Sequence, residues 1–229
     1  MSDPSSFDYY AHRKHGHDHA PGQGHGDGAA APKQDEGPPS EHEIVSRAMQ
    51  ELLEQSGVIT ADEIRRRMEI FEEEFPYRGS RVIARAWTDP AFRKRLLEDG
   101  KKACAETGVD LEATRLIAVE NTPDVHNVIV CTLCSCYPRE LLGMPPTWYK
   151  SDNYRSRVVH EPRAVLREFG TVLPDRVTVR VHDSNADMRY VVVPMRPKGT
   201  ENWSEERLAG MLTRDTLVGV TVPQAPEAE

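Results

Sequence analysis

Apolar residues between about residue 40 and residue 108 recur at every third or fourth position, the spacing that places them on one face of a helix. Ile44, Ala48 and Leu52 follow Ser40 and Glu43, which have the spacing of a capping box, and this pattern predicts a helix over 41–55. The same reasoning predicts a second helix that begins after Thr60 and runs until Pro76 interrupts it, then others over 78–87 and 89–107. This part of the chain is therefore expected to be helical.

The period of the apolar residues changes after Gly108. Short runs rich in valine and isoleucine, bounded by turn residues, are typical of buried strands. Such runs lie at 116–119, 128–130, 177–181 and 190–193. Turns are predicted at 121–124, within the first pair of runs, and at 183–185, within the second.

Two further helical patterns accompany these strands. One spans 155–169 and is closed by Gly170, and the other spans 204–212 with Ser204 as its cap. The elements predict an α+β fold in which a helical N-terminal arm precedes an α/β domain with a small number of strands.

The two ends of the chain differ in composition from the rest. Residues 1–39 hold almost no aliphatic side chains and are rich in Gly, Pro, Asp and His, so burial cannot offset the entropy of ordering them. We divide the chain into a disordered leader (1–39), a helical arm (40–108), an α/β domain (109–223) and a solvated tail (224–229). Three leader histidines at alternate positions could hold cobalt, nickel or zinc loosely, although a solvated segment without a chemical role is the simpler interpretation; they are His15, His17 and His19.

Charge and hydropathy exclude two classes of partner. The 229 residues carry a formal net charge of −8, which argues against a nucleic acid as the main ligand. No apolar run approaches the roughly 20 residues that a bilayer span needs, and the first residues lack the pattern of a signal peptide. We therefore expect a cytoplasmic protein that binds neither nucleic acid nor membrane.

Candidate chemistry is concentrated at one point, where a cysteine cluster follows the predicted strand at 128–130. Cys131, Cys134 and Cys136 lie within six residues, too close together for disulfides to be useful staples. Their thiolates can face a common centre, together with the peptide nitrogens of Ser135 and Cys136. Such a set would leave one octahedral position open, and an open position distinguishes a catalytic metal site from a structural one.

Other interpretations of the cysteines stay open at this point. A structural zinc site needs four side-chain ligands, and the remaining cysteine, Cys104, lies on a predicted helix without a paired partner. The spacing of an iron–sulfur cluster is absent. Three inert thiols would be the plainest case, but clustering of this kind is improbable from packing alone. For Cys104 we favour a small core residue.

The cysteine cluster and its surroundings carry a resemblance to a known family. The segment from Val130 to Tyr137 resembles the metal-claw motif of nitrile hydratase α subunits, which the γ subunit of thiocyanate hydrolase shares. Further segments resemble the family in the same order, so that the similarity extends from about Glu43 to Pro223. They are Arg85–Pro90, Gly143–Lys150, Tyr154–Val159, Arg196–Thr200 and Leu217–Val220.

The resemblance implies a fold with α-β-β-α layers and a defined metal centre. Cys131, Cys134 and Cys136 would supply three sulfurs, and the amides of Ser135 and Cys136 two nitrogens, to one low-spin trivalent metal per chain. Cys134 would be oxidised to sulfinic acid and Cys136 to sulfenic acid. Thr132 and Tyr137 resemble the cobalt subgroup rather than the iron subgroup, so cobalt(III) is expected and iron(III) is the alternative.

The resemblance also implies an activity and partners. A nitrile hydratase is a hydro-lyase that converts R–C≡N to R–CO–NH2 and works with a β subunit, as a heterodimer or an α2β2 assembly, after maturation by an activator protein. We expect the sulfenate oxygen of Cys136 to act as nucleophile or base and the Ser135 hydroxyl to position water or substrate. Arginines of the β subunit would bind the oxidised sulfurs, with Arg155 and Arg157 of this chain supporting the interface.

Two other functions stay open. Arg139 follows the claw where nitrile hydratases usually place tryptophan, as in the thiocyanate hydrolase γ subunit, and a cation there suits an anionic substrate. The segment 183–185 also leans towards thiocyanate hydrolase, whereas 120–127 looks like nitrile hydratase. A protein that carries cobalt or nickel without catalysis is the alternative from another class.

Overall fold

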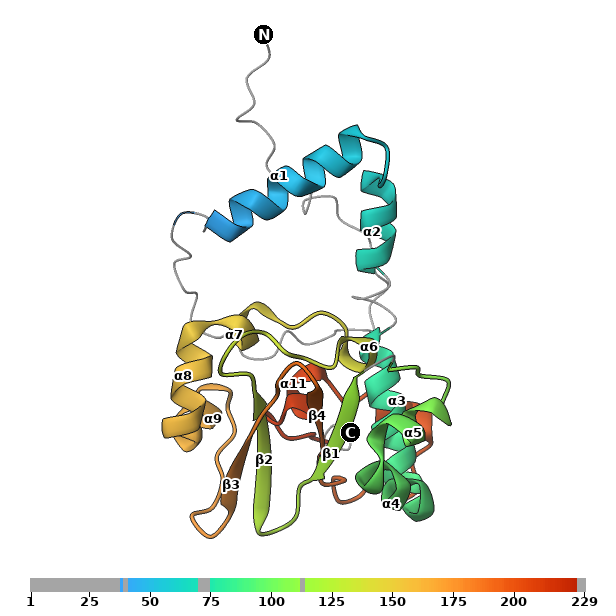
Figure 1. Cartoon of the computed structure of the whole chain (residues 1–229). Helices are drawn as coiled ribbons and strands as arrows, with labels where there is room; N and C mark the ends of the chain where they lie inside the picture. Colours follow the sequence, from blue (N-terminus) through green and yellow to red (C-terminus); the bar gives the residue numbers. More distant parts are fainter. Residues whose placement is uncertain (1–37, 39–40, 70–74, 112–113, 226–229) are drawn as a thin grey trace, which may run out of the picture.

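Two short parallel sheets lie at the centre of the structure, a computed structural model that describes residues 38, 41–69, 75–111 and 114–225 (Figure 1). Strand β1 (Arg115–Glu120) pairs with β4 (Met188–Val193), and β2 (Val125–Val130) pairs with β3 (Thr178–Asp183). The expected strands are all present. Strands joined by a predicted turn belong to different sheets, so the turn after β1 carries the chain from one sheet to the other.

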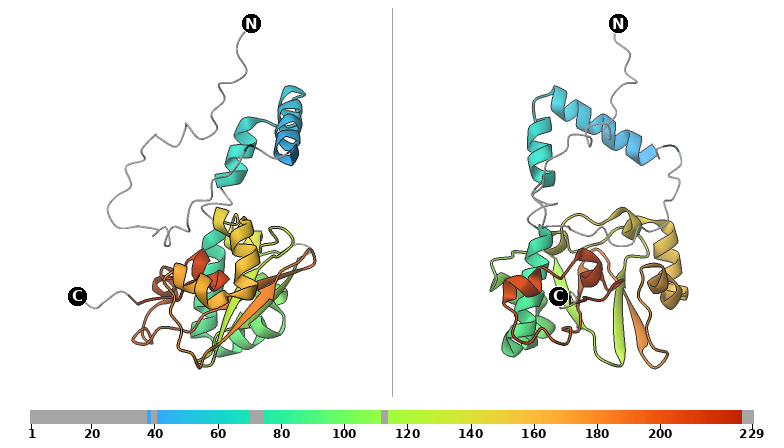
Figure 2. Two further views of the ribbon diagram at one scale, coloured as in Figure 1. Left: turned by 90° about the vertical axis from the view of Figure 1, so that its left-hand side faces the viewer. Right: turned by 180° about the vertical axis from the view of Figure 1, so that it is seen from behind.

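Helices cover the outer side of each sheet. On one side α8 (Asp152–His160) and α9 (Pro162–Glu168) lie beside the β2–β3 sheet, and on the other α3 (Phe75–Thr88), α4 (Pro90–Glu98) and α5 (Gly100–Ala105) lie beside the β1–β4 sheet (Figures 1 and 2). This order confirms the expected α+β fold with α-β-β-α layers.

The core draws on both the expected arm and the expected α/β domain. Fully buried side chains from α3 and α4 belong to the same apolar cluster as those of the strands; examples are Ile83, Phe92, Leu96, Ile129 and Val191. In the part of the chain that the structure describes, no helix is both long and apolar enough to cross a bilayer.

The first two helices stand away from these layers (Figures 1 and 2). Helix α1 (Glu41–Gln55) matches the predicted range and buries none of its residues. Helix α2 (Ala61–Glu69) begins at the predicted capping box, in which the Thr60 N–H donates to Glu63 Oε2 at 2.9 Å and the Glu63 N–H donates to Thr60 Oγ1 at 3.2 Å. The leader that precedes α1, apart from residue 38, lies outside the described residues, as does 226–229 of the tail.

Two prolines begin helices where the sequence pattern had suggested otherwise. Pro76 does not end the second helix but lies in the first turn of α3, where a missing N–H is tolerated. Pro162 likewise begins α9, so the helix expected over 155–169 is two helices separated at Glu161. The predicted end is confirmed: Gly170 follows α9 with a φ of +81°.

The helix expected over 89–107 is also divided. Asp99 ends α4 and caps α5, accepting a hydrogen bond from the Lys102 N–H at 3.1 Å. The chain passes very close to β1 here, because a Cβ at Gly100 would lie 2.7 Å from the Leu116 carbonyl oxygen. The break therefore has a tertiary cause, which the spacing of apolar residues does not contain.

Some short helices were not predicted. They are α6 (Arg139–Leu142), α7 (Thr147–Lys150) and α11 (Arg214–Val218), each too short to show a helical period. By contrast, α10 (Glu205–Ala209) begins at the expected cap, where Ser204 Oγ accepts from the Arg207 N–H at 3.3 Å.

A buried polar network connects β2 with its surroundings. The His126 ring lies between the Asn121 side-chain nitrogen, 3.3 Å from Nδ1, and the Gly219 carbonyl, 2.7 Å from Nε2. Because a carbonyl only accepts, Nε2 carries the proton and Nδ1 accepts. Asn121 in turn accepts from the Asn127 N–H at 2.8 Å, and His182 Nε2 lies 2.9 Å from Asn127 Oδ1.

This network predicts a loss of stability in mild acid. Burial lowers the pKa of His126 below its ordinary value near 6.5, and that of His182 shifts in the same direction. Below about pH 6.5 the unfolded chain binds protons that the folded chain does not, so the unfolding free energy falls by up to about 1.4 kcal/mol per pH unit per histidine. Urea unfolding at pH 7.5 and 5.5 should show a smaller drop for His126→Gln than for the wild type. Equal drops would contradict this assignment.

Candidate metal centre

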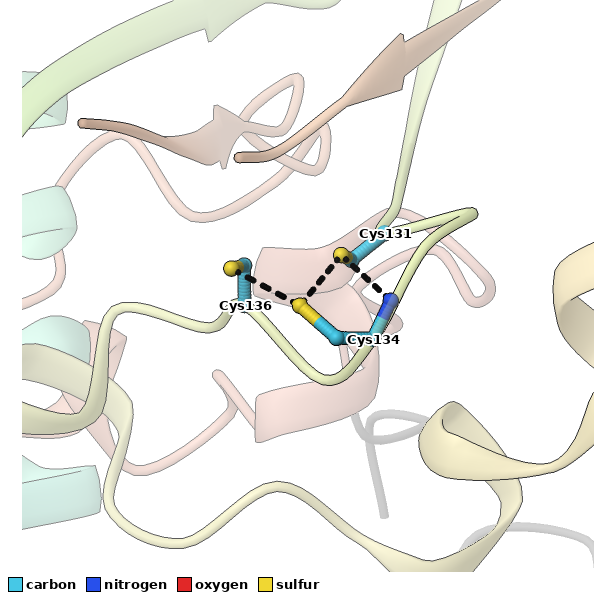
Figure 3. Close-up of side chains that lie close together, drawn as sticks. All are labelled: Cys131, Cys134 and Cys136. Atoms are coloured by element: carbon cyan, nitrogen blue, oxygen red, sulfur yellow. Dashed lines mark hydrogen bonds between the residues drawn. The ribbon is translucent and has the colours of Figure 1, made fainter. Parts of the chain in front are cut away.

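The claw is the loop 131–136, which follows β2 without a break. The sulfurs of Cys131, Cys134 and Cys136 point towards one another and all lie within 4.8 Å of each other (Figure 3). The Sγ–Sγ distances are 3.3 Å from Cys131 to Cys134 and 3.2 Å from Cys134 to Cys136. The backbone turns tightly enough for the Cys134 N–H to donate to the Cys131 sulfur at 3.2 Å. The structure therefore brings together the sulfurs that the sequence singled out.

The three thiols differ in their access to solvent and in acidity. Cys131 is completely buried, Cys136 is half-buried and Cys134 is exposed. Hydrogen bonds from the neighbouring Cys136 and Cys131 thiols lower the pKa of Cys134 below its ordinary value. Burial raises the pKa of Cys136 to about 12, an effect that the charge of Arg189 on β4 opposes. The first thiolate of the cluster is therefore the exposed one.

The donor set fits a soft transition metal with an incomplete side-chain coordination. Thiolates favour such ions, and the half-buried Ser135 places its peptide nitrogen inside the same loop. Among the described residues the metal-ligand group contains these three cysteines and no fourth side chain, which disfavours structural zinc. Cys104 is buried in α5, where desolvation raises its pKa to about 12, as expected of an inert core thiol.

A carboxylate at the end of β3 holds the beginning of the claw. Val130 lies opposite Asp183 in the β2–β3 register, and the Ser184 N–H donates to the Val130 carbonyl at 2.7 Å. Beyond the strand, Thr132 donates to both carboxylate oxygens of Asp183, from its N–H at 2.9 Å and from Oγ1 at 2.5 Å. The segment 183–185 was expected as a turn and as a point of likeness to thiocyanate hydrolase, so the contact of Asp183 with the claw was missed.

Removing this anchor should weaken metal binding. We expect Asp183→Ala to lower the cobalt bound per chain, after expression with limiting cobalt, by about tenfold, the effect of losing a group that orients ligands. Asp183→Asn keeps an oxygen that accepts from the Thr132 N–H and should retain more cobalt. Wild-type cobalt content in Asp183→Ala would show that the claw holds its shape without the carboxylate.

Two buried tyrosines bond backbone carbonyls, one at the last residue of the claw and the other inside β2. The Tyr149 hydroxyl donates to the Cys136 carbonyl at 2.9 Å, and the Tyr154 hydroxyl donates to the Ile129 carbonyl at 2.6 Å. Both tyrosines lie in segments that resemble the family, but no pattern in the sequence predicted that the Tyr149 hydroxyl reaches the claw. A hydroxyl that bonds a backbone carbonyl 13 or 25 positions away leaves no periodic signal.

The arginines predicted near a subunit interface lie on α8. Arg157 forms ion pairs with Glu161 at 2.6 Å and Glu168 at 2.5 Å, which link α8 to α9. Arg155 is three-quarters buried, pairs with Asp152 at 3.1 Å, and its Nε has no hydrogen-bond partner among the described residues. Contact of either arginine with a second subunit stays a prediction.

Comparisons with known proteins show which family the chain resembles in sequence. The sequence profile described as "Nitrile hydratase, alpha chain" matches residues 40–221. The low-molecular weight cobalt-containing nitrile hydratase subunit alpha of Rhodococcus rhodochrous is 48% identical over 193 residues, 82% of this chain and 93% of that protein. Thiocyanate hydrolase subunit gamma of Thiobacillus thioparus is 42% identical over 197 residues, 81% of each chain.

Solved structures that resemble this chain belong to the same group of proteins as its sequence relatives. A double mutant of the Fe-type nitrile hydratase from Comamonas testosteroni Ni1 superposes with a TM-score of 0.73 at 39% identity, covering 83% of this chain and 95% of that one. Residues 40–221, which the nitrile hydratase profile matches, form the layers, the claw and both helices that stand away from the layers. This chain belongs to the nitrile hydratase α-chain family.

Proposed function

We propose that this chain is the metal-holding α subunit of a cobalt-type nitrile hydratase, which hydrates a nitrile to its amide together with a β subunit in the cytoplasm. The observation that carries the proposal is the convergence of the sulfurs of Cys131, Cys134 and Cys136 on one loop, in a chain 48% identical to a cobalt-containing nitrile hydratase α subunit. Thr132 and Tyr137 favour cobalt over iron.

Each candidate site residue of the chain would have its own role. Cys131, Cys134 and Cys136, with the amides of Ser135 and Cys136, would hold cobalt(III), which when bound supplies a Lewis acid that polarises the nitrile. The Ser135 hydroxyl, half-buried beside Cys134, would orient water or substrate. An oxidised Cys136 sulfur would offer its oxygen as nucleophile or base, and R–C≡N with one water gives R–CO–NH2.

Solvent access supports the oxidation pattern that this proposal includes. Oxidants reach exposed thiolates first. Cys134, exposed and with a lowered pKa, would become the sulfinic acid, half-buried Cys136 the sulfenic acid, and fully buried Cys131 would stay a thiolate. Oxidised sulfurs carry negative charge and need cationic partners. Arg189 is one such cation near Cys136, and we assign the others to the β subunit.

Metal content and peptide mass test the proposal. The chain should be expressed with its β subunit, the activator and cobalt. We expect about one cobalt per chain and a claw peptide that carries two added oxygens at Cys134 and one at Cys136, as sulfinic and sulfenic acids require. The Cys104 peptide is the internal control, because this thiol is buried and should stay unmodified. Zinc with unmodified cysteines would overturn the proposal.

A thiocyanate hydrolase γ subunit is the second candidate. Arg139 supports it, since this exposed arginine begins α6 two residues after the claw, directly behind Tyr137 and Pro138. The ratio of kcat/KM for a small neutral nitrile to that for thiocyanate distinguishes the two. A non-catalytic metal carrier, in contrast, would bind cobalt reversibly through unmodified thiols and turn over neither substrate.

A further inference from the structure

The closing residue of the claw is held by a buried phenol. Tyr149, on α7, is 0% exposed, and its hydroxyl donates to the Cys136 carbonyl at 2.9 Å. The same ring meets the edge of the next residue, Tyr137, with centroids 5.0 Å apart and planes at 70°. One side chain therefore fixes both the carbonyl of Cys136 and the ring that follows it.

The Tyr149 ring is itself fixed by other aromatic side chains. Trp148 lies edge-on to Tyr149 at 5.9 Å and to Tyr154 at 4.9 Å, and Phe169 from the end of α9 closes the group at 4.8 Å from Trp148. Burial raises the pKa of Tyr149 well above its ordinary value, so the phenol stays protonated. A protonated phenol is the donor that a carbonyl requires.

Cys136 is the residue at which precise placement matters most. In the proposed ligand set it supplies both its sulfur and its backbone nitrogen, whereas Cys131 and Cys134 supply a sulfur each. Cys131 is held by β2 and by its burial, and Thr132 by Asp183. The last residue of the loop has no strand after it; α6 begins at Arg139. The hydrogen bond from the Tyr149 hydroxyl holds the end of the claw at Cys136, as β2 holds its beginning at Cys131.

We propose that Tyr149 is a positioning residue of the metal centre, which orders Cys136 through its carbonyl and so prepares the claw for the metal. This inference rests on the proposed function. It predicts an effect on the electronic structure of the centre and on the rate of turnover. It predicts little effect on substrate binding, because a side chain without exposed surface does not touch substrate.

The test compares Tyr149→Phe with the wild type in the cobalt-loaded α/β complex. The variant keeps the ring and loses only the donor. We expect a shifted or weakened sulfur-to-cobalt charge-transfer band and a kcat about tenfold lower, the range for a lost group that orients ligands, with KM unchanged within about twofold. Circular dichroism and the melting temperature report whether the fold is kept.

Tyr154→Phe is the matched control. It removes a buried hydroxyl from the same aromatic group, also bonded to a backbone carbonyl, but that of Ile129, inside β2. Both variants should show a similar small drop in melting temperature. Only Tyr149→Phe should change the charge-transfer band and kcat.

The possible outcomes distinguish a failure of the proposed role of Tyr149 from a failure of the proposed nitrile hydratase function. A wild-type spectrum and kcat in Tyr149→Phe would overturn the inference and leave the proposed function standing. Equal spectral changes in both variants would also overturn it, since the cause would then be packing in general. A wild-type complex without cobalt or nitrile hydration would overturn the proposed function, and the inference with it.

Discussion

Cys134→Ala should remove both cobalt and nitrile hydration from the α/β complex. The Cys134 sulfur lies between the other two, 3.3 Å from that of Cys131 and 3.2 Å from that of Cys136. Among the described residues no other thiol lies close enough to take its place between Cys131 and Cys136. It is also the thiol whose pKa is lowered, so it is the first to offer a thiolate. We expect activity to fall by about 1,000-fold or more, equivalent to roughly 4 kcal/mol of transition-state stabilisation. Cobalt analysis and amide formation are the measurements.

Cys104→Ala controls for the loss of a thiol. Cys104 is fully buried in α5 and away from the claw, so its replacement leaves a small cavity and costs about 1 kcal/mol of stability. Cobalt content and the specific activity of the folded complex should not change. If Cys134→Ala retained cobalt and turnover while folded, the claw could not be the centre of the reaction.

The parts of the structure that the sequence predicted correctly depend on neighbouring residues. Helix α1 has the predicted bounds, and the caps at Thr60 and Ser204 form because side chain and amide are three positions apart. The claw is local in the same sense. Cys131 follows a buried strand, and the three thiols lie within six residues, so a single tight loop can bring their sulfurs together.

The parts that could not be predicted depend on distant residues. Asp183 reaches Thr132 across 51 positions only because β3 lies parallel to β2, and nothing in the apolar pattern states which strands pair. Tyr149 reaches Cys136 because α7 folds back over the claw. The break between α4 and α5 similarly needs the close approach of β1 at Gly100. The spacing of the cysteines thus pointed to the candidate ligands, whereas tertiary contacts position the loop that carries them.

We expect the largest loss of stability from a substitution at one such contact, the close approach of Gly219 to β2. Gly219, after α11, has a φ of +92°, and a Cβ built there would overlap the Asn127 carbonyl oxygen in β2. The overlapping atom is backbone inside a paired strand, so it cannot move aside as a flexible side chain could. Gly219→Ala should therefore combine the cost of a left-handed conformation with that of overpacking, about 3 kcal/mol or more in total.

Gly170→Ala isolates the conformational part of this cost. Gly170 also has a left-handed φ, +81°, but no atom lies within 4 Å of the position its Cβ would take. Its replacement should cost about 1–2 kcal/mol. Thermal unfolding of the α/β complex should show a drop of roughly 10 °C for Gly219→Ala and about half of that or less for Gly170→Ala.

Cobalt content separates this prediction from a general loss of stability. The overlap at Asn127 can be relieved only by moving β2 or the end of α11, and His126, the neighbour of Asn127, bonds the Gly219 carbonyl at 2.7 Å. Since the claw begins one residue after β2 ends, a displaced strand displaces Cys131 with it. Gly219→Ala should consequently lose cobalt at temperatures where its helices are still folded, whereas Gly170→Ala should keep it. Equal melting temperatures and equal cobalt contents in the two variants would mean that the close approach of Gly219 to β2 does not exist in solution.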